Sequence, residues 1–299
     1  MDYHGEKQVK SGLVALIGPP NVGKSTLLNA LLGLKISIVS PKPQTTRNKI
    51  LGIVNGEDYQ IVILDTPGIH TARSTLNREM VRIAVESLAD VDVIIFMIDI
   101  SFPLPEKISE ATGHLQKAGK PVILLVNKTD LAPGEKLLPI LAAYSNVFPF
   151  QAMIPISALH RDGTDILLAE LLPLLPTGPR LYPADIPTDA TERFIAAEII
   201  REKIFLLTTQ EVPYSCAVLV DSFKEDEKKI TIHATIFVER KSQKGIIIGR
   251  QGSMLKQIGQ AARLELQELL GIRVVLKLWV KIKEGWSTDA LFLRELGLG

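Results

Sequence analysis

The sequence Gly18-Pro-Pro-Asn-Val-Gly-Lys-Ser25 constrains the fold more than any other part of the chain. It follows an apolar run, Leu13–Ile17, and precedes a helical pattern, Thr26–Leu32. A glycine-rich turn between a strand and a helix lets backbone N–H groups approach phosphates at the positive end of the helix. In such a loop Lys24 reaches the β- and γ-phosphates as a catalytic residue, and the Ser25 hydroxyl ligates Mg²⁺. The predicted nucleotide contacts of this loop are Asn21, Val22, Gly23, Lys24, Ser25 and Thr26.

Up to about residue 175, short β-branched apolar runs alternate with longer helical patterns such as Arg78–Leu88 and Lys136–Ala143. Continuous apolar strands separated by helices indicate a mostly parallel sheet with helices on both faces. Ligands of such sheets bind at the carboxyl ends of the strands. The predicted strands are Leu13–Ile17, Ile61–Leu64, Val93–Ile98, Val122–Val126 and Met153–Ile156.

Asp65-Thr66-Pro67-Gly68 follows the predicted strand Ile61–Leu64. An aspartate before a turn often only caps that turn. After a phosphate-binding loop, however, an acid at this strand end holds Mg²⁺ through water, and we expect this role for Asp65. The backbone N–H of Gly68 is expected to sense the γ-phosphate, which makes Gly68 a predicted catalytic residue. All four residues are predicted nucleotide contacts.

Asn127-Lys128-Thr129-Asp130 follows the predicted strand Val122–Val126. We expect the two carboxylate oxygens of Asp130 to accept the paired N1–H and N2–H donors of guanine, a pair that adenine lacks. A buried acid left without these donors is costly, so the arrangement discriminates between bases. Asn127 is expected to brace the neighbouring loops, and the stem of Lys128 is expected to cover the base.

Two further segments complete the predicted nucleotide site. Ser157-Ala158-Leu159, after the last predicted strand, is expected to offer a backbone N–H to the guanine carbonyl oxygen. Gln44-Thr-Thr-Arg-Asn48 lies in a loop rich in proline and lysine, which is either an ordinary exposed loop or a nucleotide-dependent switch. We expect a switch whose threonine hydroxyl closes on Mg²⁺ and the γ-phosphate, and we favour Thr46 over Thr45 as ligand and catalytic residue. The predicted magnesium ligands are Ser25, Thr46 and Asp65.

The composition changes at Pro176–Pro187, which has four prolines and no periodicity and is typical of an extended linker. Beyond it the pattern runs helix, strand, strand, helix, helix, strand, which predicts a small α+β domain. We therefore predict one domain at 1–176, a linker at 177–191 and a second domain at 192–299. The predicted elements of the second domain are a helix at Glu192–Leu207, strands at Cys216–Phe223 and Lys229–Glu239, a glycine-rich turn at Gly245–Gly252, a helix ending near Leu270 and a strand at Val274–Ile282.

Gly245-Ile-Ile-Ile-Gly-Arg-Gln-Gly252 resembles the signature of KH domains, with Gly249–Gly252 as the GxxG loop. The resemblance implies an RNA-binding domain whose loop clamps about four nucleotides. We expect Ile246, Ile247 and Ile248 to line the groove that receives unstacked bases. A GxxG sequence alone is often only a tight turn. The predicted RNA contacts are Lys244, Gly245, Ile247, Ile248, Gly249, Arg250, Gln251, Gly252 and Lys256.

Charge supports contact with nucleic acid in this part of the chain. The whole chain has a net charge of +1, whereas Arg240–Lys283 has ten lysines and arginines against two acids, Glu265 and Glu268. Such a local excess of positive charge suits contact with phosphates. The alternative is a solvated cationic face on an ordinary α+β domain.

Bulk composition narrows the class of protein. The 299 residues, 46% hydrophobic and 22% charged, are typical of a soluble globular protein of two domains. The single cysteine, Cys216, cannot form an internal disulfide, and the start of the chain has no signal-peptide pattern, so we expect a cytoplasmic protein. The apolar runs Val91–Ile100 and Pro121–Val126 are too short to span a bilayer.

The five nucleotide-binding segments, in this order, resemble the translation-factor-related class of P-loop GTPases. Ile69 stands after Asp-Thr-Pro-Gly, where Ras-like enzymes place the glutamine that orients the attacking water. An aliphatic side chain cannot orient water. Asn21 matches an asparagine that ligates potassium in related GTPases with a hydrophobic residue at the Ile69 position. The resemblance thus implies that K⁺, recruited partly by Asn21, supplies positive charge to the transition state.

A P-loop GTPase domain joined to a C-terminal type II KH domain resembles the Era family of bacterial GTPases over nearly the whole chain. The resemblance includes Gly178–Pro183, Arg193–Lys203, Val212–Ser215 and Val280–Trp286. It implies hydrolysis of GTP to GDP and phosphate with Mg²⁺, binding near the 3′ end of small-subunit (16S) ribosomal RNA, and a role in assembly of the small ribosomal subunit. It also implies a monomer whose GTP state controls RNA affinity, with peripheral contact at the inner face of the cell membrane.

Two other classes of function remain open at this stage. One is an RNA-binding module whose nucleotide domain is slow or inactive, an alternative that rests on Ile69. The other is a membrane-associated regulatory GTPase, because a cationic C-terminal region fits anionic lipid as well as RNA.

Overall fold

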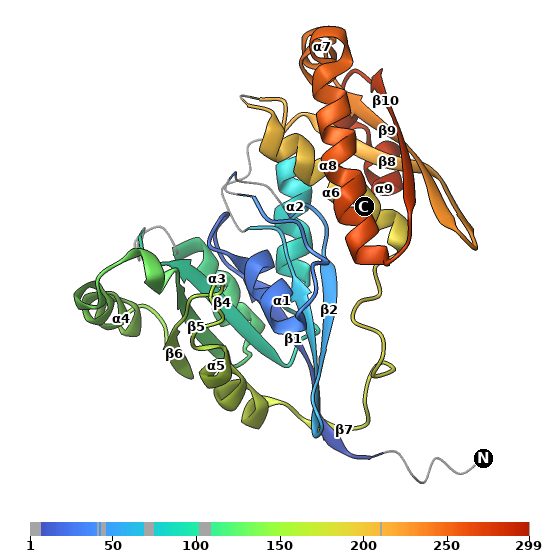
Figure 1. The fold of residues 1–299 in the computed structure, drawn as a ribbon. Coiled ribbons are helices and arrows are strands. Elements are labelled where there is room, and N and C mark those ends of the chain that lie inside the picture. The colour runs from blue at the N-terminus through green and yellow to red at the C-terminus, as the bar shows by residue number, and fades with distance from the viewer. Residues whose placement is uncertain are drawn as a thin grey trace. The chain divides into compact units, whose positions relative to one another are not determined.

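The computed structural model describes residues 7–40, 42, 46–68, 75–101, 109–209 and 211–298, and it divides into two compact units (Figure 1). The N-terminal unit comprises Met1–Ser37, Thr46–Arg73 and Met80–Asp189. The C-terminal unit comprises Ala190–Gly299 with two short segments, Ile38–Thr45 and Ser74–Glu79. The domain limits drawn from sequence stay a prediction, and the division between the compact units falls after Asp189.

A single sheet forms the centre of the N-terminal unit, with the strand order β2-β3-β1-β4-β5-β6 and β7 paired with β1. β2 runs antiparallel to β3, and β7 runs antiparallel to β1. The pairs β1–β3, β1–β4, β4–β5 and β5–β6 are parallel, so the mostly parallel sheet is confirmed. The strands are β1 (Val9–Ile17), β2 (Ile50–Asn55), β3 (Tyr59–Asp65), β4 (Val93–Asp99), β5 (Val122–Asn127), β6 (Ala152–Pro155) and β7 (Thr177–Gly178).

Helices cover both faces of this sheet. Leu115 and Tyr144, from two different helices, share one core with Phe96 and Leu124 of the central strands. All seven residues of β4 are buried, which requires cover on the second face as well. The helices are α1 (Lys24–Leu32), α2 (Thr75–Glu86), α3 (Ser109–Ala118), α4 (Leu137–Ser145) and α5 (Thr164–Leu171).

The proline-rich segment after β7 is held against β2 and β3 rather than being free. The Arg180 guanidinium donates to the backbone carbonyls of Gly56 at 2.8 Å and Tyr59 at 3.1 Å. Gln60, fully buried in β3, accepts the backbone N–H of Leu181 at 2.7 Å. The sequence predicts an extended segment here but does not show these partners, which lie more than 100 residues away in the chain.

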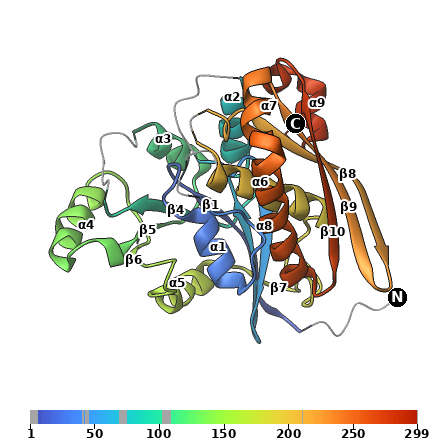
Figure 2. The same ribbon diagram turned by 45° about the horizontal axis from the view of Figure 1, so that its top comes forward.

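The C-terminal unit has the predicted order of helix, strand, strand, helix, helix, strand, followed by a short helix that the sequence did not predict. Its sheet has the order β10-β9-β8, with β9 parallel to β10 and antiparallel to β8. α6 and α8 pack together, and Figure 2 shows α8 lying along β10. The elements are α6 (Glu192–Leu207), β8 (Cys216–Asp226), β9 (Lys229–Val238), α7 (Lys241–Ile248), α8 (Ser253–Leu270), β10 (Val274–Ile282) and α9 (Ala290–Glu295).

The predicted glycine-rich turn begins too early. Gly245 lies inside α7, and the turn between helices is confined to Gly249–Gly252. Within the described residues, no helix is long and apolar enough to cross a membrane.

Candidate functional site

The predicted phosphate loop connects β1 to α1, where the chain leaves the carboxyl end of a central strand. Gly23 has a φ of 101°, and a β-carbon there would lie 2.3 Å from Nδ2 of Asn127. Only glycine fits this position without moving Asn127. Asn21, in the same loop, also has a left-handed backbone with a φ of 64°. Val22 is buried, Lys24 and Ser25 begin α1, and Thr26 follows them half-buried.

Lys24 is buried and turned back onto its own loop. Its Nζ donates to the backbone carbonyls of Gly18 at 3.1 Å and Pro19 at 3.0 Å. Burial lowers the pKa of Lys24 to about 8, although the negative charge of Asp65 acts in the opposite direction. The ammonium group is therefore held inside the loop that the motif assigns to phosphates.

The three predicted magnesium ligands lie together. Ser25 Oγ is 2.7 Å from Thr46 Oγ1 and donates to Asp65 Oδ2 at 2.7 Å. Ser37, which the sequence did not single out, donates its hydroxyl to the same Oδ2 at 2.9 Å. Among the described residues, the other oxygen, Asp65 Oδ1, is buried without a hydrogen-bond partner. Burial raises the pKa of Asp65, an effect opposed by the positive charge of Lys24 and by the two serine hydroxyls.

These four hydroxyl and carboxylate groups fit a magnesium ion. A buried carboxylate oxygen with no partner is costly, and a cation beside it removes that cost. Hard oxygen ligands, with one or two carboxylates, are the ligands that Mg²⁺ prefers. Gln44, Thr45 and Ile69, which belong to the same prediction, lie outside the described residues.

Asn127 ends β5 and connects the phosphate loop to the segment after β6. Its Nδ2 donates to the carbonyl of Val22 at 2.7 Å, and its Oδ1 accepts the backbone N–H of Ala158 at 2.9 Å. Asn127 is 2% exposed, so both bonds are buried. The side chain thus ties three loops of the site to one another.

Asp130 is exposed, which corrects the expectation of a buried acid. It lies in a short 3₁₀ turn, Thr129–Leu131, at the surface. Its Oδ1 accepts the hydroxyl of Ser157 at 2.5 Å, and Thr129 Oγ1 donates to the carbonyl of Ile156 at 3.0 Å. The carboxylate is therefore oriented by neighbouring loops while it faces solvent, where a base can reach it.

Lys128 forms an ion pair with an acid that the sequence analysis missed. Its Nζ lies 2.6 Å from Oδ2 of Asp99, the last residue of β4. An acid at the carboxyl end of a central parallel strand is a signal that could have identified Asp99.

The remaining predicted residues of the nucleotide site surround this arrangement. Thr66 is fully buried and donates its hydroxyl to the carbonyl of Leu16 at 3.0 Å. Pro67 and Gly68 follow it and are buried, and a β-carbon on Gly68 would lie 2.7 Å from the backbone nitrogen of Pro20 in the phosphate loop. Leu159 is 70% exposed and lies two residues after Ser157, which donates a hydrogen bond to Asp130.

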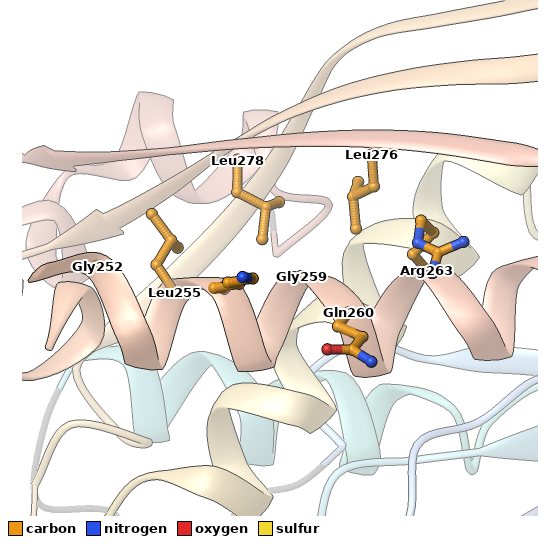
Figure 3. Close-up of a pocket in the computed structure, with 8 residues that line it drawn as sticks. Gly252, Leu255, Gly259, Gln260, Arg263, Leu276 and Leu278 are labelled. Atoms are coloured by element: carbon orange, nitrogen blue, oxygen red, sulfur yellow. The ribbon is translucent and has the colours of Figure 1, made fainter.

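The C-terminal unit has a groove with a volume of about 520 Å³, and two of the predicted RNA contacts line it. Figure 3 shows Leu276 and Leu278 of β10 projecting toward α8, which forms the opposite wall. Gly252 and Lys256 were predicted contacts, and the other residues of the groove were missed. For the missed residues on α8, a spacing of three to four, on one helix face, is the signal that could have identified them. The lining residues are Gly252, Leu255, Lys256, Gly259, Gln260, Arg263, Leu276 and Leu278.

The prediction that Ile247 contacts RNA in the groove was wrong. The residue is fully buried in the core of the C-terminal unit, so it cannot line the groove. Ile248 packs against the same core, whereas Ile246 is 39% exposed. Successive helical residues point about 100° apart, so three isoleucines in a row cannot share one face of α7.

The GxxG turn lies at one end of this groove. Gly249 and Gly252 have φ values of 72° and 79°, and Gln251 between them has a φ of 51°. The turn passes the chain from α7 to α8 and leaves Arg250 and Gln251 exposed. Lys244 and Gly245 lie one turn earlier, in α7.

Two family models match separate parts of the chain. Residues 13–128 match the model described as 50S ribosome-binding GTPase, and residues 211–287 match the KH domain model. Both lie within the regions where the sequence predicts a nucleotide domain and an RNA-binding domain.

Whole-chain comparisons agree. GTPase Era of Geotalea daltonii is 53% identical over 293 residues, which cover 98% of this chain and 99% of that protein. A point variant of Era from Aquifex aeolicus, solved with GDP·AlF4⁻, has 42% identity and a TM-score of 0.94, with 97% of this chain and 100% of that chain covered. Era solved with MgGDPNP and nucleotides 1506–1542 of 16S ribosomal RNA gives the same identity and TM-score, with 97% and 99% covered. This chain belongs to the Era family of GTPases.

Proposed function

We propose that this GTPase binds GTP and Mg²⁺ in the site formed by the loops after β1, β3, β5 and β6 and the segment before β2, and that it hydrolyses GTP there. The observation that carries the proposal is the meeting of Ser25, Thr46 and Asp65, with one buried carboxylate oxygen left for a cation. The solved relatives that carry GDP·AlF4⁻ and MgGDPNP support it. An intact set of magnesium ligands also argues against a nucleotide domain that has lost its activity.

The residues of the site have separate proposed roles. Ser25, Thr46 and Asp65 would hold Mg²⁺, which when bound neutralises charge that develops on the phosphates. Lys24 would exchange its two loop carbonyls for phosphate oxygens, as its length and burial allow. The Gly68 backbone N–H would meet the γ-phosphate at the edge of the phosphate loop.

Selectivity for guanine is proposed to come from Asp130. Ser157 orients its carboxylate, and Asn127 holds the Ser157–Leu159 segment beside the phosphate loop through Ala158. A pair of acceptors held in fixed positions binds guanine more tightly than adenine, because guanine offers two adjacent donors. The N–H of Ser157 donates to the carbonyl of Asp162 and that of Ala158 to Asn127, so the N–H of Leu159 is proposed to read the guanine carbonyl oxygen.

Potassium is proposed as an additional cofactor, recruited partly by Asn21. Asn21 is an exposed residue of the phosphate loop, and its left-handed backbone is an uncommon conformation outside glycine. Single-turnover GTP hydrolysis in matched K⁺ and Na⁺ buffers tests the idea. We expect faster turnover in K⁺, and equal rates in the two buffers would refute it.

The C-terminal unit is proposed to bind the 3′ region of small-subunit ribosomal RNA in the groove between α8 and β10. The groove combines the cations Lys256 and Arg263 with the apolar wall Leu276 and Leu278, which suits phosphates and unstacked bases together. The related structure that contains nucleotides 1506–1542 of 16S ribosomal RNA supports this ligand.

We infer from both sites that the protein acts in assembly of the small ribosomal subunit, with GTP state controlling RNA affinity. The test is GTP hydrolysis and RNA binding measured together, in K⁺ buffer, with an RNA of the sequence 1506–1542 and with a scrambled RNA of equal length. We expect binding and altered turnover only with the first RNA. A monomeric state, a cytoplasmic location and contact with the membrane stay predictions from sequence.

A further inference from the structure

The sheet of the C-terminal unit has a second face that the groove does not use. Residues alternate between the two faces of a strand, so Leu276 and Leu278 face α8 while Lys277 and Trp279 face the opposite side. The partner residues on β9 follow the same division. Ile232, Ala234 and Ile236 belong to the core, whereas His233 and Thr235 lie on the side of Trp279. We call this second side the outer sheet face.

Trp279 is half-exposed on the outer sheet face. The residue is 45% exposed. It lies on the edge strand β10, whose Val274 and Val280 pack in the core on the other side of the sheet. The ring of His233 meets it edge-on, with centroids 5.3 Å apart and an interplanar angle of 65°. The indole is thus supported on one edge while much of its surface remains in contact with water.

Two lysines flank the tryptophan along β10. Lys277 and Lys281, two residues before and after it on the same side of β10, are both exposed. β8 adds Lys224, paired in register with Thr231 of the same face. Two acids of the three strands also lie on this side. Asp221 accepts the hydroxyl of Thr235 at 2.8 Å, and Asp226 faces Lys229 at 4.0 Å at the end of the hairpin.

One end of the outer sheet face is already covered. Phe237 of β9, in register with Lys281, packs against Phe292 of α9 with ring centroids 4.9 Å apart. The part that carries His233, Lys277 and Trp279 has no such helix over it among the described residues. The open part therefore combines an aromatic surface with lysines.

We propose that Trp279, Lys277 and Lys281 form a second RNA-binding surface, on the face of the sheet opposite the groove. A base stacks on the exposed side of the indole, and the two lysines meet phosphates on either side of it. Stacking on exposed aromatics beside a cationic track is how proteins hold single strands, and sheet faces with exposed aromatics serve the same purpose.

The length of the RNA favours a second surface. This step rests on the proposed binding of small-subunit RNA. A KH groove holds about four nucleotides. The related structure contains nucleotides 1506 to 1542, which is 37 nucleotides, so most of that RNA lies beyond what a groove of this kind holds. A cationic aromatic face in the same domain suits the nucleotides that continue from the groove.

Intrinsic fluorescence gives a direct test because the chain has only two tryptophans. Trp286 is fully buried and donates its indole N–H to the carbonyl of Ser215 at 3.1 Å, so it serves as an internal reference. We expect the RNA of sequence 1506–1542 to quench the emission of the exposed Trp279. A six-nucleotide RNA from the 3′ end of that sequence, long enough only for the groove, should bind without quenching. The Trp279→Phe variant should show no quenching by either RNA.

Affinity and salt dependence supply the second readout. Trp279→Leu, which keeps an apolar side chain but removes the stacking surface, should weaken binding of the 37-nucleotide RNA about tenfold and leave the six-nucleotide RNA unchanged. Lys277→Gln and Lys281→Gln should each lower the slope of log affinity against log salt by about one for the long RNA. Leu291→Ala is the matched control, since Leu291 is 78% exposed on α9 of the same unit and should change neither measurement.

The outcomes separate this inference from the proposed function. If the long RNA binds without quenching Trp279, or if Trp279→Leu binds both RNAs as the parent protein does, the outer sheet face is not an RNA surface although RNA binding stands. If neither RNA binds, the proposed RNA-binding function fails as well. Quenching by vesicles of anionic phospholipid, with no response to RNA, would assign the surface to membranes and overturn the inference.

Discussion

The phosphate loop of the N-terminal unit and the GxxG turn of the C-terminal unit both place glycine where a phosphate-bearing ligand is proposed to bind. Their surroundings differ. A β-carbon on Gly23 would meet Asn127, a residue from a strand 104 positions later in the chain. A β-carbon on Gly249 would meet Met254 at 2.7 Å and Ser253 at 3.2 Å, both at the start of the next helix. The first loop is held by distant parts of the fold, and the second by its own local backbone.

The polar contacts follow the same division. Asn127, Asp65 and Ser157 are buried and make hydrogen bonds between loops that come from different strands. In the groove proposed to bind RNA, Lys256 and Gln260 are exposed, and Gln251 of the turn is exposed as well. A nucleotide site that must distinguish guanine from adenine needs acceptors in fixed positions. A groove for single-stranded RNA can instead bind phosphates through flexible cationic side chains and bases against a rigid apolar wall.

The largest effect is expected where an oriented acid reads the base. Asp130→Asn replaces one acceptor oxygen with a donor, which suits xanthine because its edge offers an acceptor where guanine has its amino group. Preference for GTP over XTP should fall by at least ~10³-fold, as expected when a hydrogen-bonded site loses its match. Competition between the two nucleotides for a fluorescent GDP analogue measures the change. Retained preference for GTP would show that Asp130 does not read the base.

The next largest effect tests whether distant packing fixes the phosphate loop. Gly23→Ala would push Asn127 away from Val22. Overpacking and the left-handed backbone together raise the free energy of the loop's present conformation by about 2–5 kcal/mol. Nucleotide affinity should therefore fall ~100-fold or more. The measurement is equilibrium binding of a fluorescent GDP analogue. Gly33→Ala is the matched control, because Gly33 ends α1 with a φ of 68° and has open space around its β-carbon position. Equal losses in both variants would mean that backbone strain, not Asn127, makes Gly23 necessary.

A moderate effect is expected at Ser37, which touches the proposed magnesium site only through Asp65. Ser37→Ala removes one of the two hydroxyls that hold Asp65 Oδ2, and loss of such a supporting bond typically weakens metal binding ~10-fold or more. The readout is the Mg²⁺ concentration that half-suppresses release of a fluorescent GDP analogue. It should rise about tenfold.

The control for Ser37 is another buried serine of the same unit. Ser11 is 5% exposed, and its hydroxyl has no hydrogen-bond partner among the described residues. Ser11→Ala should therefore leave the magnesium requirement unchanged. If both variants behave alike, Asp65 is positioned by its backbone rather than by Ser37.

Periodicity was sufficient to predict most elements of the fold. Glu192–Leu207 and Val274–Ile282 have the predicted bounds as α6 and β10, because polar or proline-containing segments flank regular patterns. β2 was missed, since Gly52 interrupts its apolar run and its antiparallel pairing with β3 is not a property of either sequence alone. α9 is six residues long, too short for a helical period to be recognised.

Some site residues were predicted and others were missed. The missed residues act through contacts with residues far away in the sequence. Lys24, Ser25 and Asp65 belong to motifs whose spacing reports their chemistry. Ser37 is recognisable only from its contact with Asp65, whereas the position of Asp99 at the end of a central strand was a signal that no motif reinforced. The burial of Ile247 depends on how α7 is rotated toward the core, which three consecutive isoleucines do not reveal. The domain limits and the roles of the individual site residues stay predictions.

The smallest effect is expected at Gly252 of the GxxG turn. Gly249 and Gly252 both have a positive φ, but Gly252 has a left-handed helical backbone, whereas Gly249, with a ψ of 179°, has a conformation that is almost confined to glycine. A β-carbon on Gly252 has nothing within 4 Å, whereas one on Gly249 would lie 2.8 Å from the backbone nitrogen of Met254. Gly252→Ala should cost about 1–2 kcal/mol of folding free energy from the left-handed strain alone, with RNA affinity within about twofold of the parent.

Gly249→Ala adds a close contact with the start of α8, so it should shift the helix that forms one wall of the groove. We expect Gly249→Ala to bind the six-nucleotide RNA about tenfold more weakly, which corresponds to the free-energy cost of one modestly overpacked contact. Thermal unfolding and RNA binding of the two variants, measured side by side, decide the matter. Because basal GTP hydrolysis depends on the N-terminal unit, it should be the same in both. If Gly252→Ala weakens RNA binding as much as Gly249→Ala, then contact of the turn with RNA, rather than its packing on α8, limits affinity, and the contrast between the two glycine loops holds only for Gly23.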